Sequence, residues 1–141
     1  MRKFRVLALM LATILLVGMC SVGCTSNNDI TVTLEFWTSE DAEAAWWKQE
    51  IKVNAEAPTV ELVVNEASAE YPALGCTWSD RYELSLPDYP DTKLEDGTYM
   101  FWTFTIDGVE ATAKANEASV TDGSVIKYVY TALNLEDTAA E

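Results

Sequence analysis

Apolar and polar residues alternate along several short stretches of this chain, and each of these stretches predicts a β-strand. From Ile30 to Phe36 every second residue is apolar, which is the period of two expected of a strand with one buried face. The acidic segment that follows, 38–44, predicts a loop. Residues 46–53 alternate again, with charged residues on one face, so we expect the two strands to pair as a hairpin.

The segment after Pro58 fits two periodicities. Four of its apolar residues have helical spacing: Val60, Val63, Val64 and Ala67. Strand spacing fits equally well, and β-branched residues favour it. Because proline suits the first turn of a helix, we expect a short helix over 59–69.

Turn-forming residues divide the second half of the chain. Residues 71–75 contain proline and glycine and are expected to end the helix. Residues 81–86 alternate and predict a further strand. A polar loop rich in proline and aspartate is expected over 88–97, and a stretch without clear periodicity over 111–120.

The clearest strand pattern covers residues 99–106. Four of its residues are predicted to face the core: Met100, Trp102, Phe104 and Ile106. The pair Asp107-Gly108 predicts a tight hairpin turn, because both residues tolerate the positive φ that such turns require. A second turn, 121–123, precedes a last strand over 124–131.

The N-terminal residues have the features of a secretory signal. Three basic residues lie within positions 1–5, and the apolar run 6–20 is shorter than the roughly 20 residues that cross a bilayer as a helix. Ser21-Val22-Gly23-Cys24 resembles the bacterial lipobox, in which small residues precede a cysteine whose thiol takes a diacylglyceryl group before cleavage. We expect cleavage before Cys24 and a lipid anchor on this residue.

Other processing of the same segment stays open. An ordinary signal peptide cut near Gly23 or Ser26 and an uncleaved N-terminal helix are the alternatives. The expected organisation has four parts: a signal peptide over 1–23, a tether over 24–29, one domain over 30–132 and an acidic, flexible tail over 133–141.

The charge of the chain restricts its partners. The net charge of −14 becomes −17 when Arg2, Lys3 and Arg5 are removed with the signal. A surface this acidic repels phosphate backbones, so we expect no nucleic-acid partner. It also repels anionic lipid headgroups, so the lipid at Cys24 is the expected contact with the membrane.

The residue types argue against an enzyme and against a metal site. The chain has no histidine, which removes the commonest general base and the commonest metal ligand. Cys76 has no neighbouring motif that would activate a thiol, and we expect a small, partly buried side chain. Four acidic residues of the 88–97 loop lack the spacing of a calcium-binding EF-hand: Asp88, Asp91, Glu95 and Asp96. We therefore expect no catalytic residue, no metal and a solvated acidic loop.

Large aromatic rings on both faces of neighbouring strands predict a binding surface. Tyr99 and Phe101 lie opposite the core-facing residues of their strand, and Trp46 lies on the charged face of the second strand. Exposed rings give a large contact area at low entropic cost and mark binding surfaces. Together with Trp78, which we place at the rim of this surface, they are the candidate ligand-binding residues. The alternative is that the helix and segment 71–96 cover this face.

Two segments near the C-terminus carry a recognisable pattern. Residues 96–108 run Asp-Gly-Thr-Tyr-Met-Phe-Trp-Thr-Phe-Thr-Ile-Asp-Gly, and residues 121–130 run Thr-Asp-Gly-Ser-Val-Ile-Lys-Tyr-Val-Tyr. An aromatic strand, an Asp-Gly turn, an acidic-Gly turn and a last strand ending in tyrosine make this part of the chain resemble the transcobalamin-like C-terminal domain. The resemblance extends over most of 30–131. It implies an α+β, β-grasp-like fold, with a mostly antiparallel sheet packed on one short helix.

These expectations combine into a membrane-anchored extracellular binding domain. The family occurs in bacterial surface lipoproteins and in animal cobalamin carriers, so the resemblance implies a cobamide-like or other flat small molecule as ligand. Such a molecule is expected as a ligand and not as a catalytic cofactor, and we expect no cofactor. A cell-surface protein-interaction or scaffold module without a small-molecule ligand is the alternative. With lipid at Cys24, either protein would face outward from the cell membrane.

Overall fold

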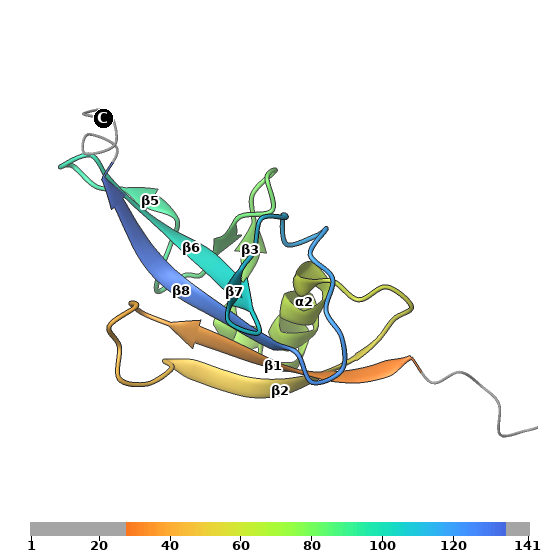
Figure 1. Cartoon of the computed structure of the whole chain (residues 1–141). Coiled ribbons are helices and arrows are strands. Elements are labelled where there is room, and N and C mark those ends of the chain that lie inside the picture. Colours follow the sequence, from red (N-terminus) through yellow and green to blue (C-terminus); the bar gives the residue numbers. More distant parts are fainter. Residues whose placement is uncertain (1–27, 135–141) are drawn as a thin grey trace, which may run out of the picture.

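The computed structural model describes residues 28–134, which form an α+β fold dominated by a sheet with one α-helix (Figure 1). Strand β1 (Asp29–Trp37) pairs antiparallel with β2 (Trp47–Asn54), and Phe36 lies opposite Trp47. The predicted hairpin is thus confirmed. The predicted signal segment and the predicted lipidation residue Cys24 lie outside the described residues.

The main sheet has the strand order β2-β1-β8-β6-β5. Strand β8 (Val125–Asn134) lies parallel to β1, and β6 (Thr98–Ile106) lies antiparallel to β8 along its whole length. Two short strands, β5 (Thr92–Lys93) and β7 (Val109–Glu110), pair with the two ends of the other edge of β6. Within residues 28–134, the β1–β8 pair is the one parallel pairing of the sheet.

The predicted turns have the backbone that their residues favour. Between β6 and β7, Asp107 has φ of 51° and Gly108 has φ of 81°, as a tight hairpin of this kind requires. Gly123, just before β8, has φ of 83°. These positive angles explain why turn residues could be placed from the sequence.

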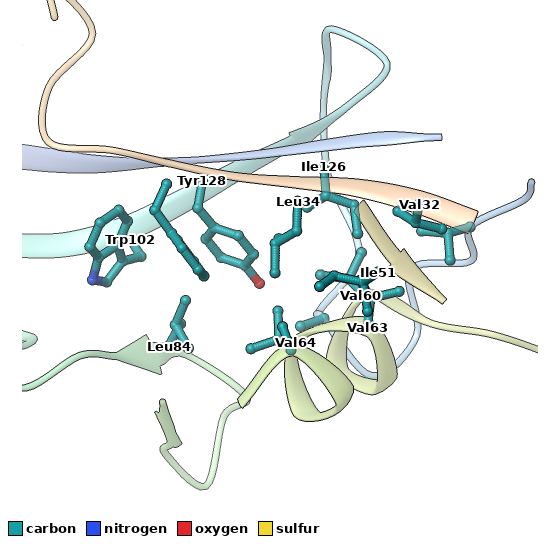
Figure 2. Packing of buried hydrophobic residues seen from close by; sticks show 14 of the residues in the cluster. Val32, Leu34, Ile51, Val60, Val63, Val64, Leu84, Trp102, Ile126 and Tyr128 are labelled. Atoms are coloured by element: carbon teal, nitrogen blue, oxygen red, sulfur yellow. The ribbon is translucent and has the colours of Figure 1, made fainter. Parts of the chain in front are cut away.

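Helix α2 (Val60–Glu70) packs on one face of the sheet and confirms the predicted helix. Its buried residues are the four at helical spacing: Val60, Val63, Val64 and Ala67. Figure 2 shows the valines of this helix facing strand residues that include Leu34 and Ile51, and all of these side chains are fully buried. Burying apolar side chains of this size contributes about 1.5–3 kcal/mol each.

Segment 111–120 is part of the core, although its sequence shows no periodicity. The carbonyl oxygens of Ala118 and Ala115 accept hydrogen bonds from the N–H groups of Val60 (3.0 Å) and Glu61 (2.9 Å). Both alanine side chains are buried. The segment therefore satisfies two of the backbone donors that a helix leaves open at its N-terminus.

The strand predicted over 81–86 is wrong in its extent. Strand β4 covers only Leu84–Ser85 and pairs with β3 (Thr77–Trp78), which the sequence pattern did not indicate. The residues between them form a turn around Ser79, and Tyr82 in this turn has a φ of 61° that no strand residue adopts. A local turn thus replaces the first half of the predicted strand.

Two further boundaries differ from the expectation. Leu133 and Asn134, assigned to the tail, belong to β8, and the polar loop 88–97 contains β5. After the helix, a short 3-10 helix, η1 (Pro72–Leu74), ends at Gly75. None of the helices within the described residues has the length and apolar character needed to cross a bilayer.

Candidate functional site

The outer face of β6, opposite helix α2, brings two of the four predicted ligand-binding residues together. Tyr99 and Phe101 are two positions apart on this strand, and Leu133 of β8 lies directly opposite Tyr99. Tyr99 and Leu133 are each 38% exposed, and Phe101 is half-buried. Side chains on one face of paired strands are in contact across the pair, so these three form an apolar floor.

This apolar floor is the base of a groove of about 510 Å³ with charged residues at its rim. The rim residues are Arg81, Glu83 and Asp91. They come from the segment between helix α2 and β6, and no periodicity in the sequence placed them near Tyr99. The sequence analysis missed Arg81, Glu83 and Leu133 because only the tertiary fold brings these segments to the aromatic strand.

The β3–β4 turn holds Arg81 and Glu83 in place through one hydroxyl group. The Ser79 hydroxyl accepts hydrogen bonds from the N–H groups of Arg81 (3.2 Å) and Glu83 (3.2 Å) and lies 3.3 Å from a carboxylate oxygen of Glu83. The Tyr82 N–H donates to the Ser79 carbonyl at 3.0 Å. A non-glycine residue with positive φ, such as Tyr82, persists only where its surroundings hold it. The turn is therefore a well-defined side of the groove.

Aromatic residues on the helix-facing side of the sheet hold the 89–91 segment, which forms the other wall of the groove. The Trp102 indole N–H donates to the Tyr89 carbonyl (2.9 Å), and the Tyr130 hydroxyl donates to the Pro90 carbonyl (2.7 Å). The Asp91 N–H donates to the Ser85 hydroxyl at 3.2 Å. These bonds fix the 89–91 segment against the sheet and set the position of the Asp91 carboxylate at the rim.

The charges at the rim do not neutralise one another in ion pairs. Burial and the nearby Glu83 carboxylate raise the pKa of Asp91 above its ordinary value. Arg81 is the single arginine within residues 28–134, and the one ion pair of this part of the chain joins Lys48 to Glu35 elsewhere. The groove thus combines an apolar floor with polar groups of both signs, which suits a flat molecule with a polar periphery.

A second hollow lies on the other side of the same turn. It has a volume of about 290 Å³, and aromatic residues of the core face, Trp102, Phe104 and Tyr128, form much of its wall. Arg81 and Glu83 line both hollows. The turn that carries these two residues therefore contributes to both hollows.

Trp46 lies elsewhere, on the helix side of the sheet. Its ring meets that of Tyr89 at 5.2 Å between centroids, and Tyr89 meets Trp102 at 6.1 Å. The side chains of Trp102 and Tyr99 point to opposite faces of β6, because they are three positions apart on a strand. Trp46, which lies on the same face as Trp102, is therefore on the face opposite Tyr99. Strand β2 begins at Trp47, so the strand alternation that assigned Trp46 to a face does not extend to it.

Trp78 does not join the groove either. Its indole N–H donates to the side-chain oxygen of Asn65 on helix α2 at 2.8 Å, and its ring packs against the core. The four predicted residues are thus divided among three places, and only Tyr99 and Phe101 share a groove.

The remaining candidates of the sequence analysis are Cys76, the acidic residues of the 88–97 loop and Cys24. Cys76 is half-buried, as the sequence predicted, and burial raises the pKa of its thiol, which keeps it protonated. Residues 28–134 contain no group of three acidic or cysteine side chains placed to hold a metal ion. The predicted lipidation residue Cys24 lies outside the described range.

Comparisons with known proteins find likeness in structure and not in sequence. The chain matches no protein-family model, and no curated protein matches its sequence. Its fold is similar to part of haptocorrin, solved in complex with Cbi, with a TM-score of 0.58 and 14% identity. The match covers 76% of this chain and 26% of haptocorrin, so the chain spans about a quarter of that protein's length. This likeness shows a shared fold.

A second solved structure gives a weaker match. It is a Ruminococcus gnavus protein whose suggested role is metal binding, with a TM-score of 0.44 and 14% identity over 72% of this chain and 96% of its own. A similarity this low carries no argument about site or function.

Proposed function

We propose that this protein is a membrane-anchored extracellular binding domain, without catalytic activity, for a flat and partly apolar small molecule. The observation that carries the proposal is the groove over β6, in which Tyr99, Phe101 and Leu133 form the floor beneath a charged rim. A planar ligand lies against the rings, and its polar edge meets Arg81 and Asp91.

A cobamide is the first ligand to test. The transcobalamin-like pattern of residues 96–108 and 121–130 suggests it, and the fold shared with haptocorrin, which was solved with Cbi, supports the choice. Within this proposal the domain has a β-grasp-like arrangement, in which the sheet wraps one helix. A groove of about 510 Å³ is within the range of roughly 300–1,000 Å³ that is usual for small-molecule sites.

The test is a titration of the full chain, purified in detergent, with cobalamin and cobinamide, followed by tryptophan fluorescence and by calorimetry. Cobamides absorb light, so an unrelated tryptophan-containing protein serves as the inner-filter control. We expect saturable quenching beyond this control, together with a calorimetric signal. The double variant Tyr99→Ala/Phe101→Ala should weaken binding about ten-fold or more, because each lost ring contact costs about 0.5–1.5 kcal/mol.

Val109→Ala is the matched control for this double variant. Val109 is an apolar residue of the neighbouring β7, is 70% exposed and lies outside the groove. Its truncation should leave the affinity unchanged. Binding that survives the double variant would place the ligand elsewhere, and a titration that matches the inner-filter control would reject cobamides as ligands of this chain alone.

A further inference from the structure

Strand β8 is longer than the strand beside it. It pairs with β6 from Ile126 to Asn134, but with β1 only from Val125 to Val129. Residues 130–133 therefore have no pairing strand on the β1 side within the described part of the chain. Figure 1 shows β6 and β8 extending together as an arm beyond the end of β1.

The backbone groups that point to this open side follow from the alternation of the strand. The Ser124 carbonyl accepts from Thr33 on the β1 side, whereas the next carbonyl, of Val125, accepts from Asp107 on the β6 side. Even-numbered residues of β8 thus direct their N–H and C=O groups toward β1. Ala132, which is exposed, presents both groups at the open edge.

The two edges of the molecule differ in how they are protected against strand addition. Strand β2, at the other end of the sheet, has exposed charged residues at alternate positions, Lys48, Glu50 and Lys52. Such charges are a common protection of edge strands. Segment 130–134, Tyr-Thr-Ala-Leu-Asn, contains no charged residue, no proline and no glycine. Its sequence leaves the edge open to another strand.

A groove of about 340 Å³ runs beside this edge. Residues 130–132 and Met100 line one side, and the β1–β2 loop lines the other with Thr38, Ser39 and Glu40. The same loop carries Asp41 and Glu43, and its three acidic side chains are exposed. With a net charge of −14 on the whole chain, the approach to this edge favours cations.

We propose that an extended, basic segment of another protein binds here as an added strand along residues 130–133. The backbone of Ala132 supplies the ladder hydrogen bonds, and the acidic loop selects lysine or arginine side chains in the segment. Strand addition of this kind gains affinity from backbone hydrogen bonds and specificity from side chains. The added strand lies along the edge of β8, whereas the small-molecule groove lies on the outer face of the sheet; Leu133 is common to both.

The experiment uses the full chain, labelled with 15N, in detergent. The probe is a capped hexapeptide, Lys-Thr-Val-Thr-Val-Lys, and its charge-reversed partner has glutamate in place of lysine. We expect the basic peptide to shift the amide resonances of segment 130–134 and to slow hydrogen exchange at Ala132. The acidic peptide should bind at least about ten-fold more weakly, and added salt should weaken the basic peptide.

Two variants test the edge itself. Ala132→Pro removes the outward N–H without removing a bond to β6, and it should weaken the basic peptide about ten-fold or more. Ala132→Ser keeps the N–H and should bind as the unchanged chain does. The spectrum of the rest of the sheet, recorded on each variant without peptide, shows that the fold is retained.

Three results would overturn the proposal. The first is that neither peptide binds, which would contradict the strand site, or that both bind equally, which would contradict the charge selection. The second is that the peptide shifts resonances outside segment 130–134, or that the same shifts appear in Ala132→Pro. The third is that the Ala132 amide is protected from hydrogen exchange without peptide, in a dimer that depends on concentration. A second copy of the chain would then be the occupant of the edge.

Discussion

The hydroxyl of Tyr128 is buried without a hydrogen-bond partner in the described part of the chain, although the ring is central to the core. Figure 2 shows it pointing between Leu34 and Val64. Burial, with a smaller effect of Cys76, raises the pKa of this phenol far above its usual range. Leaving a buried polar group unpaired costs about 1–3 kcal/mol. Tyr128→Phe should therefore raise the free energy of unfolding by about 1 kcal/mol in urea denaturation. A free energy of unfolding below that of the unchanged protein would show that the hydroxyl has a hydrogen-bond partner.

Glu35, on the outer face of the sheet, is 8% exposed and accepts hydrogen bonds from Lys48 (2.8 Å) and the Trp37 indole N–H (2.8 Å). Burial alone would raise its pKa, but the bonds from Lys48 and Trp37 outweigh burial, so the pKa lies below its ordinary value. A carboxylate with a lowered folded pKa stabilises the fold above its unfolded pKa, near 4.3, and this contribution is lost as the pH falls through the folded pKa.

Glu35→Gln should accordingly destabilise the fold by about 0.5–1 kcal/mol at neutral pH, a modest figure because Lys48 is 61% exposed. The loss should shrink toward acidic pH, where the native carboxylate becomes protonated. Urea denaturation at a series of pH values measures both effects. Glu50→Gln, at an exposed position of β2, is the control, and an equal change in that variant would contradict the assignment.

At the scale of the elements, helix α2 depends on how its N-terminus is capped. The Thr59 hydroxyl accepts from the Leu62 N–H at 3.3 Å, while distant residues of segment 111–120 satisfy the first two donors. Thr59→Ala should cost about 0.5–1 kcal/mol, since the bond is long and the other donors keep their partners. Thr59→Ser, which keeps the hydroxyl, should be nearly neutral in thermal unfolding; an equal loss in both variants would contradict the capping role.

The same element shows why part of the fold was predictable. The spacing of four buried residues and a proline before the first turn favoured a helix over residues 59–69, and the helix is there. The extent of 81–86 was not predictable in this way. Its alternation is that of a strand, but hydrogen bonds to the Ser79 hydroxyl stabilise a turn in its first half. The alternation of apolar and polar residues gives no information about such side-chain hydrogen bonds.

At the scale of the whole molecule, the proposed anchor decides where the domain acts. If Cys24 carries lipid, the chain expressed in bacteria should enter the detergent phase on Triton X-114 separation, and Cys24→Ser should move it to the aqueous phase. Mass spectrometry of the N-terminal peptide identifies the diacylglyceryl group. Cys76→Ser is the control, because Cys76 is a half-buried residue of the domain and not the predicted lipidation site. This variant should stay in the detergent phase. An unchanged partition of Cys24→Ser would reject lipidation at this residue.

The sequence by itself determined the strands around 30–36 and 99–106 and the hairpin turns, and it favoured a helix over 59–69 without excluding a strand there. Alternation, helical spacing and positive φ at glycine or aspartate are local properties, so the chain states them directly. It also identified Tyr99 and Phe101 as rings on the face of β6 that points away from the core.

Only the tertiary structure decided which residues surround those rings and which edge stays open. Arg81 and Asp91 reach the groove because the β3–β4 turn and the 89–91 segment fold against β6. Trp46 was separated from Tyr99 because it precedes its strand. Within residues 28–134, the edge of β8 is open beyond Val129 because its pairing with β1 ends there. Each of these depends on where distant segments stop and meet, which no local period encodes.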